Sequence, residues 1–348
     1  MIAAIELGKK YAQVCVKTVN MKDAESLSTV AGTENYRIPT ETDLEDKVQL
    51  QEFFRKLWKL LSPYGNKDSL EYLVFCLEDN SEEMRGRLSE IVEIYNISLE
   101  KVRFMSKQEC FCAYVFHQSA ELLSHNALLV ENCEGEKEKF ILHKRARTTP
   151  IVAEVRNISE KSLESVFSDH AISSVFLVGD DFEEEWMQKN LKILRNGRRV
   201  FAGKNLYVKG AVYRGMELKE DAEEYLYLGA EKLCCHIALC SETNGKQEYI
   251  YIVEGGRNWY ESNVALEILL LDKPELEFAL IPINGKEKKT TMIYLRDLPV
   301  RPKKTTRLRI ELEFTSVSCA KVIIKDLGFG ELFPPSDMVY EGELQWEQ

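Results

Sequence analysis

The sequence predicts an α/β protein of two domains, in which alternating strands and helices precede an antiparallel β-sandwich. Three observations lead to this prediction. The chain has 348 residues, which corresponds to about two domains of ordinary size. Strand-like and helix-like segments alternate over residues 1–217, whereas short strand-like runs separated by turn residues follow from about residue 232. Hydrophobic residues make up 45% of the chain, which is enough for a packed core and excludes an intrinsically disordered protein.

The first elements are predicted from short β-rich runs and one amphipathic pattern. Runs at 2–7 and 12–19 flank Gly8, which indicates a hairpin. Apolar residues at spacings of three and four predict a helix over 45–61. A nearly continuous apolar run at 70–77 is typical of a strand that is covered on both faces. The remaining elements of this segment are a helix at 81–95, a strand at 102–105 and a helix at 107–123.

The next segment, residues 126–217, again combines predicted strands and helices. Its predicted strands are 127–132, 139–144, 149–155 and 174–178, and its predicted helices are 159–168, 181–194 and 203–217. Two successive strand-rich segments, each followed by helices, predict two similar half-domains around a cleft, at about 1–125 and 126–217.

The C-terminal part is predicted to be a separate β-domain over 232–348. Acidic Glu220 to Glu224 precedes an apolar run, so we expect a linker at 218–231. Turn residues such as Asn284-Gly285 separate the strand-like runs, which suggests an antiparallel sandwich. These runs are 249–253, 264–271, 276–282, 290–295, 307–314 and 319–325.

Composition limits the compartment and the partners. There are 46 Lys and Arg residues against 57 Asp and Glu residues, a net charge of −11, which gives no electrostatic case for nucleic-acid or membrane-surface binding. No apolar run approaches the roughly 20 residues that span a bilayer, and the N-terminus lacks a basic region. The nine cysteines, an odd count at irregular spacing, are expected to be free thiols. We therefore expect a cytoplasmic protein.

Nine short segments carry a family resemblance through their shared order along the chain. They are Ile2 to Lys10, Tyr72 to Phe104, Phe104 to Tyr114, Ser174 to Gly179, Lys209 to Val212, Cys240 to Gly245, Leu298 to Pro302, Leu308 to Phe314 and Ala320 to Asp326. These segments resemble, in the same order, those of DnaK-type heat-shock chaperones, which belong to the actin, hexokinase and chaperone ATPase superfamily. This resemblance implies a reduced, two-lobed, actin-like ATPase-type domain at 1–217, followed by a β-sandwich similar to a chaperone substrate-binding domain. It also suggests a shortened and degenerate bacterial relative, from a domain family of unknown function.

The resemblance implies where a nucleotide would bind. Gly8, Lys9 and Lys10 stand at the first phosphate loop, and Gly179 stands in the adenosine segment. The alternative is that Gly8 only forms the hairpin turn and that both lysine side chains are solvated.

The sequence departs from the chaperone pattern where phosphate would be held. At 130–138 one glycine remains among four glutamates, which would repel a triphosphate. Only about 45 residues then precede Ser174, too few for the subdomain that helps to clamp adenine in the chaperones. We therefore expect no catalytic residues, no ATP hydrolysis and no required cofactor, and we leave binding of ATP or ADP with Mg²⁺ open.

The candidate partner site lies in the β-domain, where aromatic residues are concentrated. Tyr249, Tyr251, Trp259 and Tyr260 are the candidates for holding an extended peptide or a protein partner. Alternation places Tyr249 and Tyr251 on one face of a strand, and the alternative is that this face packs into the core.

A local group of cysteine and histidine residues does not predict a metal site. It comprises Cys234, Cys235, His236 and Cys240. Neighbouring residues on a strand point to opposite faces, so we expect buried thiols here.

These observations favour a chaperone-related binding or scaffold protein that lacks ATP hydrolysis and has a protein or peptide partner. Two alternatives stay open, a nucleotide-binding chaperone with weak ATPase activity and an actin-like assembly protein. The oligomeric state and the identity of the partner are not predicted.

Overall fold

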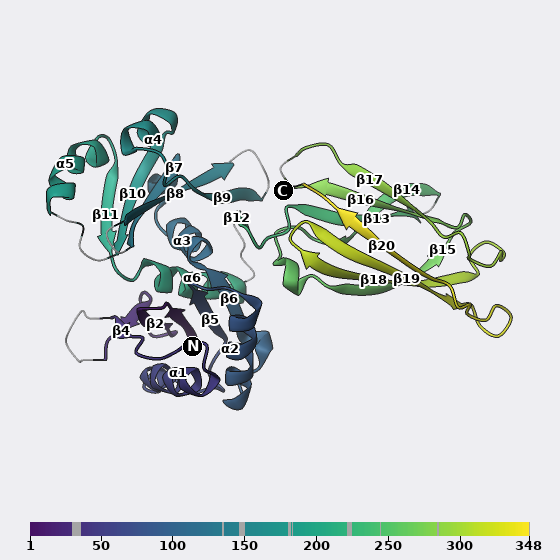
Figure 1. The fold of residues 1–348 in the computed structure, drawn as a ribbon, viewed down its shortest axis with the longest axis horizontal. Coiled ribbons are helices and arrows are strands. Elements are labelled where there is room, and N and C mark those ends of the chain that lie inside the picture. The colour runs from purple at the N-terminus through teal and green to yellow at the C-terminus, as the bar shows by residue number, and fades with distance from the viewer. Residues whose placement is uncertain are drawn as a thin grey trace. The chain divides into compact units, whose positions relative to one another are not determined.

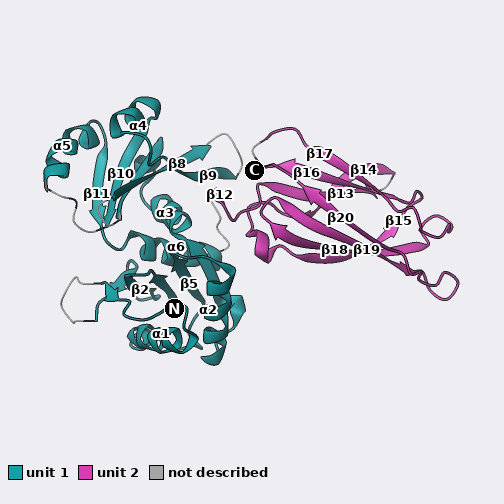
Figure 2. Ribbon diagram, viewed as in Figure 1, with its two compact units in different colours: residues 1–226 teal, residues 227–348 magenta. Residues whose placement is uncertain are grey.

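The structure is a computed structural model. It describes residues 1–29, 36–133, 136–145, 150–179, 182, 184–220, 225–243, 245–283 and 285–347. The chain forms two compact units, Met1–Leu226 and Tyr227–Gln348 (Figure 2). The segment 218–231, which the sequence predicts as a linker, contains the end of helix α6 (Leu206–Glu220) and strand β12 (Tyr225–Leu228).

The first sheet of unit 1 has the strand order β3-β2-β1-β5-β6, with β4 paired to β2. Strand β1 pairs antiparallel with β2 and parallel with β5, and β5 pairs parallel with β6. Its strands are β1 (Ile2–Leu7), β2 (Tyr11–Lys17), β3 (Glu25–Leu27), β4 (Ile38–Pro39), β5 (Tyr72–Leu77) and β6 (Val102–Ser106). Its helices are α1 (Lys47–Leu61), α2 (Glu82–Ile94) and α3 (Lys107–Phe116).

The second sheet repeats this order as β9-β8-β7-β10-β11, with β12 added beside β9 (Figure 1). Strand β7 pairs antiparallel with β8 and parallel with β10, as β1 does with β2 and β5. The strands are β7 (Asn126–Cys133), β8 (Glu136–Arg145), β9 (Ile151–Asn157), β10 (Ile172–Gly179) and β11 (Arg199–Gly203). The helices are α4 (Leu163–Asp169), α5 (Glu184–Arg195) and α6. Two separate sheets of the same order agree with the predicted division into halves.

Side-chain caps explain where several helices begin. The Asp46 carboxylate accepts hydrogen bonds from two backbone N–H groups at the start of α1. Ser81 and Ser106 cap α2 and α3 in the same way. The predicted helix at 107–123 is wrong in its extent, because α3 ends at Phe116 and a separate 3-10 turn follows at Ala120–Leu123.

Helices α3 and α6 join the halves of unit 1. A Cβ on Gly210 of α6 would lie 1.9 Å from the backbone oxygen of Cys110 on α3, so only glycine permits this crossing. Phe111 of α3 contacts Phe176 of β10, with ring centroids 5.7 Å apart. On α6, a Cβ at Gly215 would lie 2.6 Å from Ile2 of β1. Each helix therefore packs against the sheet of the opposite half.

Unit 2 is a sandwich of two four-stranded antiparallel sheets. One contains β14 (Lys246–Val253), β13 (Cys235–Thr243), β16 (Glu275–Pro282) and β17 (Lys289–Tyr294), in that order. The other contains β15 (Val264–Leu270), β18 (Thr306–Ser316), β19 (Cys319–Gly328) and β20 (Val339–Gln345). Apolar residues of both sheets, such as Phe278, Ile310 and Ile324, form the core. The six predicted strands are present as β14 to β19.

No helix in the described part of the chain is long and apolar enough to cross a membrane.

Candidate functional site

A buried polar cluster lies where the two halves of unit 1 meet. Glu6 of β1 and Glu131 of β7 occupy comparable places in the repeated sheets, near the carboxyl end of the first strand of each half. They are only 2% and 6% exposed. Glu131 accepts a hydrogen bond from Lys107 Nζ at 3.0 Å and another from Tyr207 Oη at 2.7 Å. Lys107 begins α3 and Tyr207 lies in the first turn of α6, so residues from both halves build the cluster.

Burial and neighbouring charges alter the titration of this cluster. Burial raises the pKa of Glu6 to about 7, an effect that Lys107 opposes and the Glu131 carboxylate reinforces. Burial alone would lower the pKa of Lys107, but the attraction of Glu131 and the hydrogen bond to it raise that pKa instead. Gln13 faces Glu6 across the β1–β2 pair. The buried atoms Glu6 Oε2 and Gln13 Oε1 have no hydrogen-bond partner among the described residues.

The hairpin between β1 and β2 holds three of the predicted nucleotide-binding residues. The Gly8 N–H donates to the Tyr11 carbonyl at 3.0 Å, which makes the predicted turn. The Lys9 N–H donates to Glu78 Oε2 at 2.8 Å, and Glu78 directly follows β5. A Cβ on Gly8 would lie 2.9 Å from the same carboxylate oxygen. The side chains of Lys9 and Lys10 are exposed.

Glu78 is an unfavourable neighbour for a nucleotide phosphate at this hairpin. A phosphate at this hairpin would need backbone N–H donors, and the Glu78 carboxylate already accepts the one from Lys9. It would also meet the charge of Glu78 at close range. Lys107, a cation within the cluster, is paired with Glu131.

The remaining predicted nucleotide residue, Gly179, has a φ of +115° at the end of β10. A Cβ there would lie 2.6 Å from the Asn132 backbone oxygen, so this glycine permits the close contact between β10 and β7. Residues 134–135, within the stretch 130–138 that departs from the chaperone pattern, and residues 180–181, which follow Gly179, lie outside the described residues.

The four predicted partner-binding aromatics form two pairs. Tyr249 and Tyr251 face the same side of β14, opposite Cys240 and Ala238 of β13. Tyr251 is 52% exposed, and its ring stacks on His236 with centroids 4.8 Å apart. The Tyr249 hydroxyl donates to Glu277 at 2.6 Å, which raises its pKa to about 12.

Trp259 and Tyr260 make the other pair. They belong to the 3-10 turn Trp259–Glu261, and their ring centroids are 5.7 Å apart. Trp259 packs against the sandwich core. Of the four residues, Tyr251 is thus the one whose large apolar surface is most exposed.

The cysteine and histidine group is spread over both faces of its strand. Cys235 points into the sandwich core, whereas His236 lies on the outer face beside Tyr251. The Cys234 thiol donates a hydrogen bond to the Glu347 carbonyl at 3.5 Å, and the interaction with the adjacent Cys235 thiol lowers the pKa of Cys234. Within the described ranges, no three His, Cys, Asp or Glu side chains are grouped to hold a metal ion.

The repeated halves define a duplicated, two-lobed α/β unit followed by a β-sandwich. The chain belongs to the family described as a family of unknown function, DUF5716, C-terminal, which matches residues 24–230. A second family, described as a domain of unknown function, DUF8552, matches residues 232–346. Neither description mentions a DnaK-type chaperone, and no curated protein matches the chain.

Solved structures similar to this chain include the apo ParM protein of pSK41, at 10% identity and a TM-score of 0.39, covering 64% of this chain and 98% of ParM. A Bacteroides thetaiotaomicron protein with an actin-like ATPase fold and unknown function is 12% identical, with a TM-score of 0.36 and coverages of 61% and 95%. The activator of 2-hydroxyisocaproyl-CoA dehydratase from Clostridium difficile, with bound ADPNP, is 9% identical, with a TM-score of 0.34 and coverages of 66% and 99%. No activity follows from these similarities.

Proposed function

We propose that this chain is a binding or scaffold protein that does not hydrolyse ATP. In this proposal unit 1 is a fixed, actin-like scaffold, and the β-sandwich of unit 2 holds an extended peptide or a segment of a protein partner. The observation that carries the proposal is the hydrogen bond from Lys9 N–H to Glu78, because it places a carboxylate at the backbone donor that a phosphate would need.

The central cluster supports the same proposal. Lys107 and Glu131 come from different halves of unit 1 and form a buried ion pair at 3.0 Å. Phosphoryl transfer needs positive charge that is available to the transferred group. Here Glu131 already neutralises Lys107, and Glu6 and Glu78 add acidic groups nearby.

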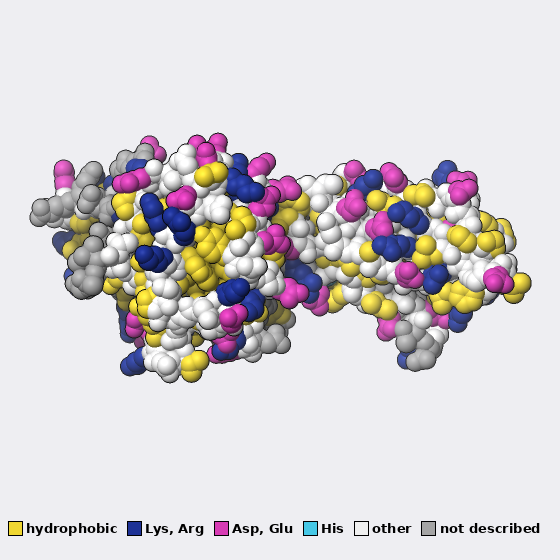
Figure 3. All heavy atoms as spheres, turned by 90° about the horizontal axis from the view of Figure 1, so that it is seen from below, with side chains coloured by type: hydrophobic (Ala, Val, Ile, Leu, Met, Phe, Trp, Pro, Cys, Tyr) yellow, Lys and Arg dark blue, Asp and Glu magenta, His cyan; other side chains and the backbone are white. Residues whose placement is uncertain are grey.

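The surface charge supports a protein or peptide partner over a nucleic acid. On the face shown in Figure 3, Lys and Arg side chains alternate with Asp and Glu side chains. A continuous basic surface, which nucleic-acid binding requires, does not lie on that face. The net charge of −11 agrees with this.

A nucleotide titration tests the part of the proposal that concerns unit 1. Isothermal calorimetry and thermal unfolding are measured with Mg-ATP and Mg-ADP at millimolar concentration, and phosphate release is followed with the full chain. We expect no saturable heat, no shift of the midpoint and no turnover above background. Glu78→Gln, which removes the charge and keeps the shape, is the matched variant. Saturable binding or steady turnover by the unchanged protein would overturn the proposal.

A further inference from the structure

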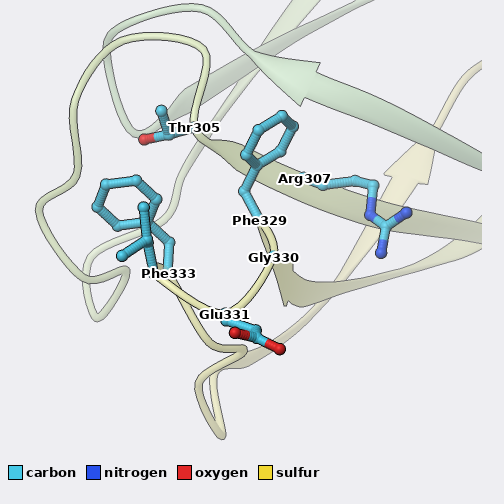
Figure 4. A pocket seen from close by; sticks show the side chains of 7 residues that line it. Thr305, Arg307, Phe329, Gly330, Glu331 and Phe333 are labelled. Carbon is cyan, nitrogen blue, oxygen red and sulfur yellow. The ribbon is translucent and has the colours of Figure 1, made fainter.

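The sandwich has an open pocket of about 550 Å³ at the end where β18 begins and β19 ends. Its lining comprises Thr305, Arg307, Phe329, Gly330, Glu331, Leu332 and Phe333. Figure 4 shows the rings of Phe329 and Phe333 on opposite sides of a space beneath Thr305. The volume lies within the range of pockets that hold small ligands or single large side chains.

The loop that carries the two rings is held firmly. Arg301 makes two hydrogen bonds of 2.7 Å to the Asp326 carboxylate and a third of 2.7 Å to the Pro334 carbonyl. Asp326 also accepts hydrogen bonds from the Ser336 side chain and the Gly328 N–H. This network fixes both ends of the loop, so the pocket is formed before any ligand arrives. Preorganisation of this kind lowers the entropic cost of binding.

Large apolar side chains surround the pocket and face solvent. Leu332 is 86% exposed and Phe329 is 45% exposed. Leu269 of β15, which pairs directly with Arg307, is 49% exposed. Contiguous exposed apolar side chains around a fixed pocket are typical of a recognition site for an apolar group.

The charges at the rim indicate what should accompany that apolar group. The Arg307 guanidinium is 49% exposed and lies 3.6 Å from Glu267, a distance that leaves its other donors open to a ligand. Lys304, next to Thr305, is exposed and has no ion pair among the described residues. In Figure 4 the Glu331 carboxylate lies at the outer edge of the loop, pointing away from both rings. Arg307 and Lys304 therefore lie near the apolar pocket, together with the carboxylates of Glu267 and Glu331.

We propose that this pocket binds a large apolar side chain of an extended acidic peptide, whose neighbouring carboxylate pairs with Arg307. The inference rests on the proposed function and specifies it, because it assigns the partner-binding site to the Phe329–Phe333 loop and not to the outer face of β14. The aromatic and leucine side chains supply apolar contact, and Arg307 and Lys304 select for negative charge.

The test uses the full chain and a fluorescein-labelled eight-residue Ser/Thr peptide with one central phenylalanine between two aspartates. Two control peptides replace the phenylalanine by alanine or both aspartates by asparagine. We expect saturable anisotropy for the first peptide. The alanine control should bind at least tenfold more weakly, because it loses the burial of an aromatic side chain. The asparagine control should bind about two- to fivefold more weakly, because Arg307 is half exposed and an exposed ion pair contributes up to about 1 kcal/mol.

Four variants locate the site. Leu332→Ser and Arg307→Gln change exposed side chains and should leave the thermal midpoint unchanged. We expect Leu332→Ser to weaken binding at least fivefold, and Arg307→Gln to weaken it about two- to fivefold. Tyr251→Ser, on the outer face of β14, and Val339→Ser, at an exposed position on β20, should leave binding unchanged.

The outcomes separate the pocket from the proposed function. Peptide binding that survives Leu332→Ser and Arg307→Gln would overturn the pocket and leave the binding function in place. Failure of a diverse peptide library, with the phenylalanine peptide included, to bind the full chain would overturn the proposed peptide-binding function itself. Self-association that Leu332→Ser abolishes, without peptide binding, would assign the pocket to a second copy of the chain and overturn the inference.

Discussion

Replacing Glu6 by glutamine should stabilise the protein at alkaline pH and have little effect at acidic pH. Glu6 is buried at the end of β1, and its pKa is raised from 4.5 to about 7 by burial and by the carboxylates of Glu131 and Glu78, against the attraction of Lys107 and Arg37. A pKa raised by that amount means that ionising Glu6 costs about 3 kcal/mol more in the folded protein than in the unfolded chain.

The sign follows from proton binding. Between pH 4.5 and about 7 the folded protein holds the Glu6 proton more tightly than the unfolded chain does, so the contribution of Glu6 to stability falls as pH rises. Glutamine at this position does not titrate, and its amide can donate to the buried Gln13 Oε1 across the strand pair.

The assay is urea unfolding of the protein and of Glu6→Gln at pH 5 and pH 8. The difference between their free energies of unfolding should grow by about 2.5 kcal/mol in favour of the variant from pH 5 to pH 8. Glu121→Gln, which changes a carboxylate that is 74% exposed, is the control and should show no such growth. A difference for Glu6→Gln that is the same at both pH values would refute the reasoning.

Two further substitutions test the packing and the pocket loop. Gly210→Ala should lower the free energy of unfolding by about 3 kcal/mol or more, because the added Cβ would overlap the Cys110 backbone oxygen. The control Gly86→Ala, on the open face of α2, should raise the free energy of unfolding by up to about 1 kcal/mol. Equal effects of the two substitutions in thermal unfolding would contradict the helix crossing. Arg301→Gln should lower the free energy of unfolding by about 3 kcal/mol, because the fully buried Asp326 side chain loses its charged partner. The control Lys303→Gln, at an exposed ion pair, should lower it by less than about 1 kcal/mol. Denaturant midpoints that do not distinguish the two variants would argue against the network.

Elements with a strong apolar pattern could be predicted from the sequence, whereas the exposed strand β11 could not. The helix α1 buries Leu50, Phe53, Phe54, Leu57 and Leu61, the stripe that predicts it. Strand β5 is buried along nearly its whole length, as its continuous apolar run indicates. By contrast, β11 lies at the edge of its sheet with most of its residues exposed, so no alternation marks it. Because β11 extends to Gly203, α6 begins at Leu206, three residues later than predicted.

The central cluster could not be predicted because its members are far apart in sequence. Lys107 and Glu131 are separated by 24 positions, and Tyr207 lies 76 positions beyond Glu131. No spacing motif relates them, since the duplicated topology brings them together. A signal was nevertheless present: each half begins with an apolar strand that carries one glutamate near its end. Comparing the two halves position by position would have paired Glu6 with Glu131.

The first phosphate loop shows why a motif is judged best by its contacts. The sequence places Gly8 and two lysines at a turn, and either a bound phosphate or a simple hairpin agrees with that pattern. The decisive residue is Glu78, which lies 69 positions from Lys9 and belongs to no motif of the loop. The Glu78 carboxylate accepts a hydrogen bond from the Lys9 N–H, so this backbone donor is already paired.

Two contacts hold the halves of unit 1 together at their centre. Lys107 comes from the first half and Glu131 from the second, and both side chains are largely buried. Removing either partner while the halves stay packed would leave a buried unpaired charge, which costs about 3–5 kcal/mol. The second contact is that of Gly210 on α6 with the Cys110 backbone on α3, which leaves no room for a larger side chain. The ion pair and the glycine contact therefore fix the packing of one half of unit 1 on the other.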